Sequence, residues 1–341
     1  MVFKQYWGDY KSREVYLFRI TNASGAYVEL INLGATIVSI YVPNKYGRLM
    51  NTVLGFPTLD GYIKDNCYLG RTIGRFANRI SQGRFFLDDW MWNLETNDGK
   101  HNNHSGSDGF HDKVMDFREE EDGVVFFYTS PHLEGGFPGT VDFQVKYSWS
   151  HKNELLIEYG AVSDRSTYVN FTNHSYFNLE FGSPKILAHR LVVESELMIE
   201  NTSEHIPSRI ISINGRNELN GKKVGHSVLY KEMRHIGLNN YYILKRKGND
   251  KPSLIRLEAP RSGIELNICT SYPGVQVYTG DYLKTAVRGN EGMKYGPFEG
   301  LCLECHNYPD FPNQPNFPKA VLFPNMQMKE FIKYKFGVLE E

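Results

Sequence analysis

Apolar and polar residues alternate one by one along many short segments of this chain, which is the pattern of half-buried β-strands. The clearest segment is residues 140–149, TVDFQVKYSW, where every second side chain is apolar. One face of such a strand lies on a core and the other meets water. Similar alternation predicts strands at residues 26–33, 124–128, 155–159 and 264–268, and a hairpin over 85–94 that turns at Asp88 and Asp89.

Helical periodicity is nearly absent, and Gly and Asn turn residues separate the strands. We therefore predict an all-β protein, a large antiparallel β-sandwich, instead of a doubly wound α/β fold. No linker or internal repeat divides the 341 residues, so we expect a single domain over residues 1–341. The proline-dense stretch 309–318, PDFPNQPNFP, is expected to be an ordered extended loop, because proline has no N–H to donate to a central strand.

Charge and composition favour a small ligand over a polymer. The chain has 38 Lys plus Arg against 39 Asp plus Glu, a formal net charge of -1 at pH 7. No global field would therefore attract nucleic acid. A small, weakly charged molecule is a better candidate for the ligand. The protein itself is expected to be a monomer or a homodimer.

Cysteine usage and hydropathy predict a cytoplasmic protein. The four cysteines are too sparse to form a disulfide framework in a chain of this size, which favours a reducing compartment. The first residues, MVFKQYWGDYKSREVYLF, are charged and polar where a secretory signal needs an apolar region. No later stretch approaches the ~18 uncharged apolar residues of a membrane span, so no membrane association is expected.

A carboxylate stands inside an apolar strand near the C-terminal end. Residues 300–306, GLCLECH, place Glu304 on the same face as Cys302, whereas the two leucines and Cys305 face the other way. Burying a carboxylate is costly unless it is paired or functional. Glu304 is therefore either a general base at the floor of a cleft, with a pKa raised by desolvation, or a salt-bridged rim residue.

A histidine-bearing segment, NFTNHSYFNL at residues 170–179, forms a second candidate. His174 lies between Asn173 and Tyr176, and an imidazole in such a polar setting can exchange protons near neutral pH. A histidine in a strand can equally be a structural hydrogen bonder, so this segment alone leaves both roles open.

Two patterns could suggest a metal, but neither predicts a site. Cys302 and Cys305 form a C-x-x-C whose side chains point to opposite faces of a strand, with no second cysteine pair at ligand spacing. His101 and His104 form an H-x-x-H in the polar loop KHNNHSG, which off a helix does not present both rings on one face. We expect no metal.

Taken in order, five segments resemble the galactose mutarotase, or aldose 1-epimerase, family across nearly the whole chain. They are NLGATIVSIYVPNKYG with LGF at 54–56, GRTIGRFANRIS at 70–81, FTNHSYFNL at 171–179, PGVQVYTG at 273–280 and GLCLECHNYPDFPNQPNFP at 300–318. The resemblance implies the family's single large β-sandwich, its mutarotase-like supersandwich. It also implies an isomerase that interconverts the α and β anomers of a free sugar of the galactose or glucose type, without metal or cofactor.

The resemblance also assigns the catalytic pair. Glu304 matches the general base that takes the proton from the anomeric C1 hydroxyl, and His174 matches the general acid that protonates the ring oxygen. The ring opens, the chain rotates about the C1–C2 bond, and the ring recloses with the two roles reversed. Only protons move between sugar oxygens and two side chains, so no cofactor is implied.

The expected substrate-binding residues are His104, Asn78, Arg79, Asn239 and Tyr176. His104 aligns with a second family histidine near the ring oxygen, and Asn78 and Arg79 align with residues that hold sugar hydroxyls. Asn239 departs from the family, which has G-x-D-H where this chain has GLNN at 237–240. The family carboxylate is thus an amide here, which predicts a weaker enzyme or a changed substrate preference.

Other functions remain open on the sequence. A noncatalytic or altered-specificity sugar-binding protein is favoured by Asn239, whereas the presence of both Glu304 and His174 argues against it. A hexose 6-phosphate epimerase would need a cationic phosphate site, for which Arg71, Arg75 and Arg79 could be proposed, although they carry no phosphate signal of their own. A glycosidase would need a second carboxylate facing Glu304, and none is evident.

Overall fold

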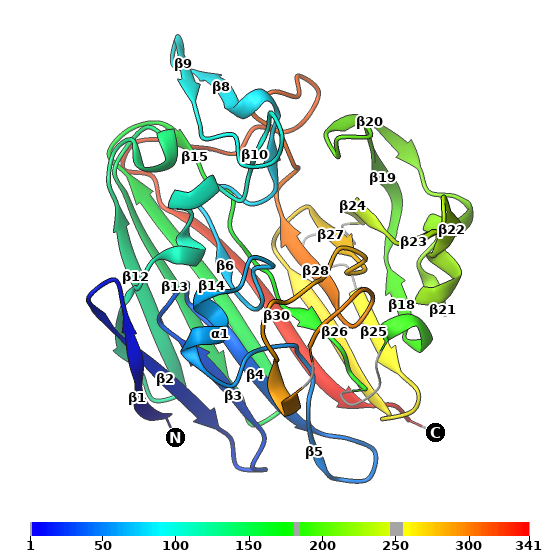
Figure 1. The fold of residues 1–341 in the computed structure, drawn as a ribbon. Helices are drawn as coiled ribbons and strands as arrows, with labels where there is room; N and C mark the ends of the chain where they lie inside the picture. Colours follow the sequence, from blue (N-terminus) through cyan, green and yellow to red (C-terminus); the bar gives the residue numbers. More distant parts are fainter. Residues whose placement is uncertain (1, 181–184, 246–254, 293, 341) are drawn as a thin grey trace.

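Three antiparallel β-sheets form most of the computed structural model, which describes residues 2–180, 185–245, 255–292 and 294–340 (Figure 1). Within these ranges the sheets have nine, six and five strands. The prediction of a large antiparallel β-sandwich is confirmed, and the five-residue α1 (Leu59–Ile63) agrees with the scarcity of helical periodicity.

The nine-stranded sheet contains, in spatial order, β11 (Asp116–Glu119), β12 (Gly123–Ser130), β13 (Val141–Trp149), β14 (Glu154–Ser163), β30 (Met328–Val338), β26 (Ile264–Thr270), β25 (Ile255–Ala259), β18 (Arg190–Val193) and β21 (Asn220–Lys223). The six-stranded sheet contains β17 (Tyr176–Phe177), β28 (Leu301–His306), β27 (Gly274–Tyr278), β24 (Asn239–Leu244), β19 (Ser195–Asn201) and β20 (Pro207–Ser212). The five-stranded sheet contains β1 (Val2–Tyr10), β2 (Arg13–Thr21), β3 (Tyr27–Ile31), β4 (Thr36–Pro43) and β5 (Leu49–Asn51).

Shorter elements connect the sheets. The two-stranded pairs are β10 (Asn102–Asn103) with β7 (Arg79–Ile80), β15 (Thr167–Tyr168) with β29 (Val321–Leu322), β16 (Thr172–Asn173) with β6 (Thr72–Ile73), β22 (Leu229–Lys231) with β23 (Arg234–Ile236), and β8 (Arg84–Leu87) with β9 (Trp90–Asn93). The short 3₁₀ turns are η1 (Ser81–Gly83), η2 (Gly106–Asp108), η3 (Phe110–Asp112), η4 (Glu134–Gly136), η5 (Ile186–Ala188), η6 (Gly215–Asn217), η7 (Val224–Ser227) and η8 (Asn290–Gly292).

One large apolar core joins the three sheets. Phe18 of β2 packs on Phe126 of β12 with ring centroids 5.5 Å apart. Phe177 of β17 packs on Tyr334 of β30 at 5.2 Å. The nine-stranded sheet, whose strands run side by side through the molecule in Figure 1, is thus the layer on which both other sheets pack.

The strand alternation predicted from the sequence is observed. Strand β13 buries every second side chain, as expected for residues 140–149. The expected hairpin forms between β8 and β9, and its turn residues Asp88 and Asp89 both have positive φ, 50° and 61°. Aspartate tolerates this left-handed conformation better than most residues, so the turn closes without glycine.

The proline-dense stretch 309–318 is ordered but folded into turns, so the expectation of an extended loop was wrong. The backbone N–H groups of Asn313 and Gln314 both donate to the carbonyl of Asp310, at 3.0 and 3.2 Å. The buried Asp310 carboxylate also accepts the backbone N–H of Ser81 at 2.9 Å. A buried carboxylate needs several donors, and curling the chain around Asp310 supplies them.

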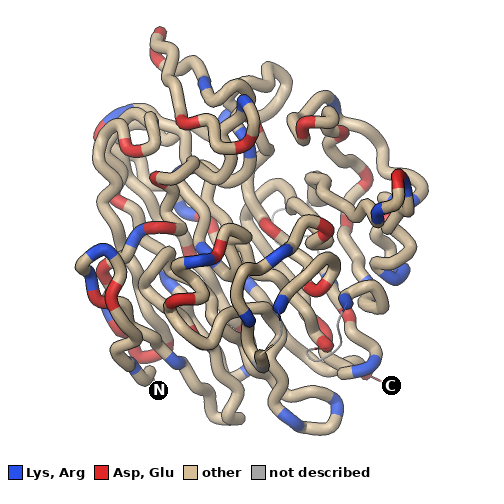
Figure 2. Tube along the Cα trace, viewed as in Figure 1, with Lys and Arg blue, Asp and Glu red and all other residues tan. Residues whose placement is uncertain are grey.

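Figure 2 shows Lys and Arg interspersed with Asp and Glu along the chain trace. No helix in the described part of the chain is long and apolar enough to cross a membrane. The predicted absence of nucleic-acid partners stays a prediction.

Candidate active site

All seven residues predicted to serve catalysis or sugar binding line one pocket of about 390 Å³. The lining consists of Asn66, Cys67, Tyr68, Asn78, Arg79, Asp98, Asn103, His104, His174, Tyr176, His205, Asn239, Gln276, Tyr278, Tyr282 and Glu304. Most of these side chains are polar or aromatic, a composition suited to a ligand with many hydroxyl groups.

Three neighbouring strands of the six-stranded sheet supply the pocket floor. Glu304 on β28 lies opposite Gln276 on β27, and Tyr278, two residues later, lies opposite Asn239 on β24. Residues paired in this way point to the same face of a sheet. The residues next to Glu304 on β28, Leu303 and Cys305, point to the opposite face and into the apolar core. The predicted orientation of Glu304, on the face opposite the leucines, is therefore confirmed.

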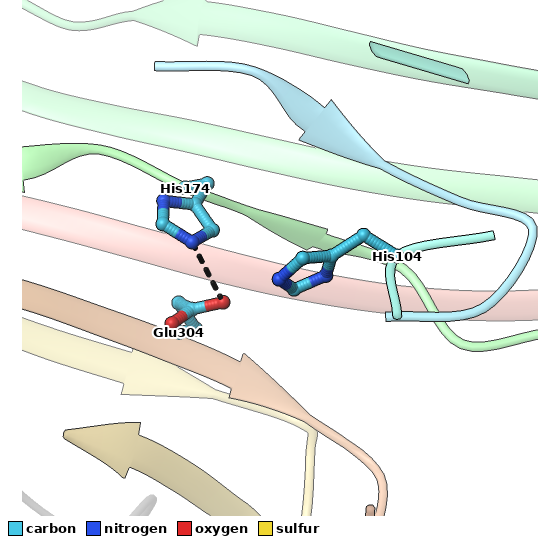
Figure 3. Close-up of side chains that lie close together, drawn as sticks. All are labelled: His104, His174 and Glu304. Carbon is cyan, nitrogen blue, oxygen red and sulfur yellow. Dashed lines mark ion pairs between the residues drawn. The ribbon is translucent and has the colours of Figure 1, made fainter. Parts of the chain in front are cut away.

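His174 lies between β16 and β17 and faces Glu304 across the pocket floor (Figure 3). Its backbone N–H donates to the carbonyl of Arg71 at 2.8 Å, and its carbonyl accepts from Gly70 at 3.0 Å. Its ring atom Nε2 lies 3.6 Å from Oε2 of Glu304. Within the described residues, Oε2 of Glu304 is a buried atom without a hydrogen-bond partner. A buried carboxylate oxygen without a hydrogen bond is positioned for a ligand.

Burial shifts the two facing groups in opposite directions. It raises the pKa of Glu304 to about 8, against the opposing positive charge of Arg79. It lowers the pKa of His174 to about 4, and the nearby His306 acts in the same direction. Desolvation penalises the charged form of each group. At neutral pH the pair therefore carries one proton, held mainly by Glu304.

His104 completes the group of side chains in Figure 3. Its ring packs edge-to-face on the ring of His174, with centroids 5.4 Å apart. Its Nδ1 accepts the backbone N–H of Asn78 at 3.2 Å. Burial first, and then the positive charges that His174 and Arg79 can carry, hold the pKa of His104 well below its usual range. A neutral ring that accepts at Nδ1 carries its proton on Nε2, so His104 is a hydrogen-bond donor.

Asn78 and Arg79 reach the pocket from β7 and the turn before it. Asn78 has a φ of +70°, and its Oδ1 accepts the backbone N–H of Arg79 at 2.7 Å. The Nε of Arg79 donates to Asp98, also at 2.7 Å. The guanidinium is therefore held beside the pocket by an ion pair, and within the described residues its remaining N–H groups are available to a ligand.

The other two arginines of GRTIGRFANRIS are structural. Arg75 is 2% exposed and donates to Ser130 Oγ and to the carbonyls of residues 130, 131, 138 and 139. Arg71 is likewise buried and donates to the carbonyls of His111 and Tyr62. Neither lines the pocket. The three arginines therefore do not form one phosphate site, because Arg79 alone of the three lines the pocket.

The fold brings together a set of possible metal ligands that the sequence did not suggest. The atoms of His104, His174 and Glu304 that could ligate a metal all lie within 4.8 Å of one another. The hydrogen bond from Asn78 to Nδ1 of His104 opposes this use. It leaves the proton on Nε2, and a protonated nitrogen cannot ligate a metal. The set fits proton transfer to a ligand better than metal binding.

Several pocket residues were missed by sequence analysis. Gln276 and Tyr278 occupy the two polar positions of the alternating strand PGVQVYTG, so their shared face could have been predicted. Tyr68, His205 and Asp98 come from loops or turns without a periodic pattern. Tyr68 packs on both His104 and His174, at 5.0 and 5.8 Å between ring centroids.

Comparison with known proteins shows the family of this chain. A family model described as Aldose 1-epimerase matches residues 16–335. Galactose mutarotase of Bos taurus is 36% identical over 313 residues, which are 91% of each chain. Aldose 1-epimerase of Escherichia coli (strain K12) is 29% identical over 94% of each chain. A solved aldose epimerase homologue from C. elegans superimposes with a TM-score of 0.90 at 29% identity, covering 95% of this chain and 99% of that one. The chain therefore belongs to the aldose 1-epimerase family of isomerases.

Proposed function

We propose that this aldose 1-epimerase opens and recloses the ring of a free hexose of the galactose or glucose type, with Glu304 as general base and His174 as general acid. The observation that carries the proposal is the 3.6 Å separation of Glu304 Oε2 and His174 Nε2 at the floor of the pocket. The galactose part is supported by relatives named galactose mutarotase, one of them 36% identical to this chain.

The short separation matches the chemistry of an anomeric centre. The C1 hydroxyl and the ring oxygen are bonded to the same carbon, so the base that serves one and the acid that serves the other must lie close together. A general base must also be within hydrogen-bond reach of the proton that it removes. The unpartnered Oε2 of Glu304 is available for the C1 hydroxyl, and Nε2 of His174 for the ring oxygen.

The reaction conserves the single proton of the pair. In the reactive arrangement Glu304 is ionised and His174 is protonated. As the bond between C1 and the ring oxygen breaks, the C1 hydroxyl gives its proton to Glu304 and His174 protonates the ring oxygen. Both groups are then neutral, which is the state that burial favours. Rotation about C1–C2 and the reverse transfers produce the other anomer.

Other pocket residues hold the sugar. The Nε2–H of His104 is a donor beside His174 and can bind the ring oxygen, and Arg79 supplies charged donors for hydroxyl groups. Tyr68 and Tyr176 pack on His174, with ring centroids 5.8 and 5.2 Å from it, and His174 is buried. A drier site strengthens each hydrogen bond to the sugar.

A glycosidase is a poorer fit to the pocket. The other carboxylate that lines it within the described residues is Asp98, which is 44% exposed and ion-paired with Arg79. A glycosidase needs two carboxyl groups that flank the bond being cut, one of them protonated. Asp98 is committed to Arg79 and lacks that freedom.

Optical rotation tests the proposal. Freshly dissolved α-D-galactose and α-D-glucose should reach their equilibrium rotations faster with the protein than without it. Glu304→Gln and His174→Asn should each lower kcat by at least ~10²-fold. Glu299→Gln, the same substitution at a half-buried glutamate outside this pocket, is the matched control and should keep the wild-type rate. Near-normal rates in either site variant, with folding verified by circular dichroism, would remove the assignment.

A further inference from the structure

Three amide side chains from separate segments form a continuous hydrogen-bonded row beside the pocket. Asn78 is its first member and accepts the backbone N–H of Arg79 at Oδ1, at 2.7 Å. Its Nδ2 donates to Oε1 of Gln276 at 3.3 Å. Nε2 of Gln276 in turn donates to Oδ1 of Asn239 at 2.6 Å. The row therefore runs from the backbone of β7 across β27 to Asn239 on β24.

The direction of the row is set at its first bond. A backbone N–H can only donate, so the atom of Asn78 that faces it must be the carbonyl oxygen. Nδ2 of Asn78 then faces Gln276, which must present Oε1, and Nε2 of Gln276 faces Asn239, which must present Oδ1. Turning any one amide over would place two donors or two acceptors against each other, and leaving such groups unpaired is costly.

Asn239 ends the row with its NH₂ group available to a ligand. The residue is half-buried and lines the pocket. Its Oδ1 is used by Gln276, and its Nδ2 has no hydrogen-bond partner in the described part of the protein. The side chain therefore offers donors to the pocket. An aspartate at this position would offer acceptors and a negative charge.

We propose that Asn239 is a specificity-determining residue, and that the site prefers an aldose bearing a carboxylate, a hexuronate, over the corresponding neutral hexose. This inference rests on the proposed function. A carboxylate is an acceptor without a proton and makes stronger, charge-assisted hydrogen bonds with amide donors. A hydroxyl that accepts a hydrogen bond from Asn239 still needs a separate acceptor for its own O–H.

The charges of the pocket permit an anionic ligand. Asp98 and Glu304 are the carboxylates in the described lining of the pocket. Asp98 is neutralised by the guanidinium of Arg79, whose Nε lies 2.7 Å from its Oδ2. In the described part of the chain the guanidinium keeps N–H groups free for a ligand. Replacing Asn239 by a carboxylate would add an uncompensated negative charge to the same lining. The amide at position 239 therefore both removes a repulsion and supplies a donor.

The test compares kcat/KM, by polarimetry on single anomers, for D-galacturonate against D-galactose and for D-glucuronate against D-glucose. The wild-type ratio of uronate to hexose should exceed one. Asn239→Leu removes the donor without adding charge and should lower the ratio about tenfold, and Asn239→Asp should lower it about a hundredfold, as expected for the loss of a charge-assisted hydrogen bond without and with added repulsion. Asn240→Asp places the same charge on the next residue, which points to the other face of β24, and should change the ratio by less than about twofold.

A second variant tests the row itself. Gln276→Met removes the donor to Oδ1 of Asn239 without adding charge to the pocket lining. The amide of Asn239 is then no longer held with its NH₂ toward the pocket. The uronate preference should fall about two- to tenfold although residue 239 is unchanged.

The outcomes separate the two proposals. A wild-type preference for the neutral hexoses, or ratios that Asn239→Leu and Asn239→Asp leave unchanged while hexoses are still turned over, would overturn the role of Asn239 alone. No catalysis of any of the four sugars by the wild-type protein would overturn the proposed function, and this inference with it.

Discussion

Oε2 of Glu304 and Nε2 of His174 lie 3.6 Å apart at the floor of the pocket. Burial has moved their pKa values in opposite directions, to about 8 for Glu304 and about 4 for His174. Below pH ~4 both groups are protonated and Glu304 cannot accept a proton, whereas above pH ~8 both have lost their protons and His174 has none to give. We therefore expect kcat/KM to be bell-shaped, with limbs near these two values. A kcat/KM that does not change from pH 4 to pH 9 would contradict these protonation states of Glu304 and His174.

The same burial makes Glu304 costly for stability. The folded-state pKa of about 8 lies above the usual value of 4.5. The folded form thus binds the proton more tightly, and the stability that this supplies is complete below pH 4.5 and is lost as the pH rises through 8. Glu304→Gln should be more stable than the wild type by ~2–4 kcal/mol at pH 8 and nearly equal at pH 4.5. Thermal denaturation at both pH values measures this, and a difference that does not change with pH would count against it.

Metal removal should leave the activity intact. The hydrogen bond from the backbone of Asn78 to His104 keeps the proton on the pocket-facing nitrogen, so the three-residue set is not a preformed ligand set. Activity should survive prolonged treatment with EDTA or phenanthroline. A loss that added zinc restores would instead assign His104, His174 and Glu304 as metal ligands.

Arg75 should matter for folding and not for sugar affinity. Its guanidinium is buried and donates to four backbone carbonyls and one hydroxyl, and each of these oxygens would lose that donor in Arg75→Met. The free energy of unfolding should fall by ~3–5 kcal/mol. Urea denaturation checks this, with Arg165→Met at an exposed position as the control. An unchanged denaturation midpoint would contradict this structural role, and a folded variant with strongly raised KM would show that Arg75 serves the ligand.

Arg79 should affect both affinity and the alkaline limb of the pH profile. Its positive charge opposes the rise in the pKa of Glu304. Arg79→Met should therefore raise KM about tenfold by removing a charged donor, and move the alkaline limb to higher pH. Asp98→Asn, which keeps the arginine and removes its ion-pair partner, should move that limb the opposite way or leave it in place. A limb that does not respond to Arg79→Met would separate Arg79 from Glu304.

Local alternation of side chains was sufficient to predict much of the fold and the position of the base. The pattern of residues 140–149 predicted β13, and the pattern around Glu304 placed it on the face opposite the leucines. Both follow from the two-residue repeat of a strand, which depends only on neighbours in sequence. The roles of Glu304 and His174 came from the family resemblance and stay predictions, as do the single-domain organisation and the cytoplasmic location.

Tertiary structure decided which side chains meet. Asn78 and Gln276 are separated by 198 positions, and the row that they form with Asn239 exists only because β24 pairs with β27 and the turn before β7 packs beside them. The burial of Arg75 and the curled loop around Asp310 likewise depend on partners distant in sequence. Sequence patterns report the face on which a side chain lies. They do not report which donor or acceptor it meets there, because hydrogen-bond partners across a fold are set by long-range packing.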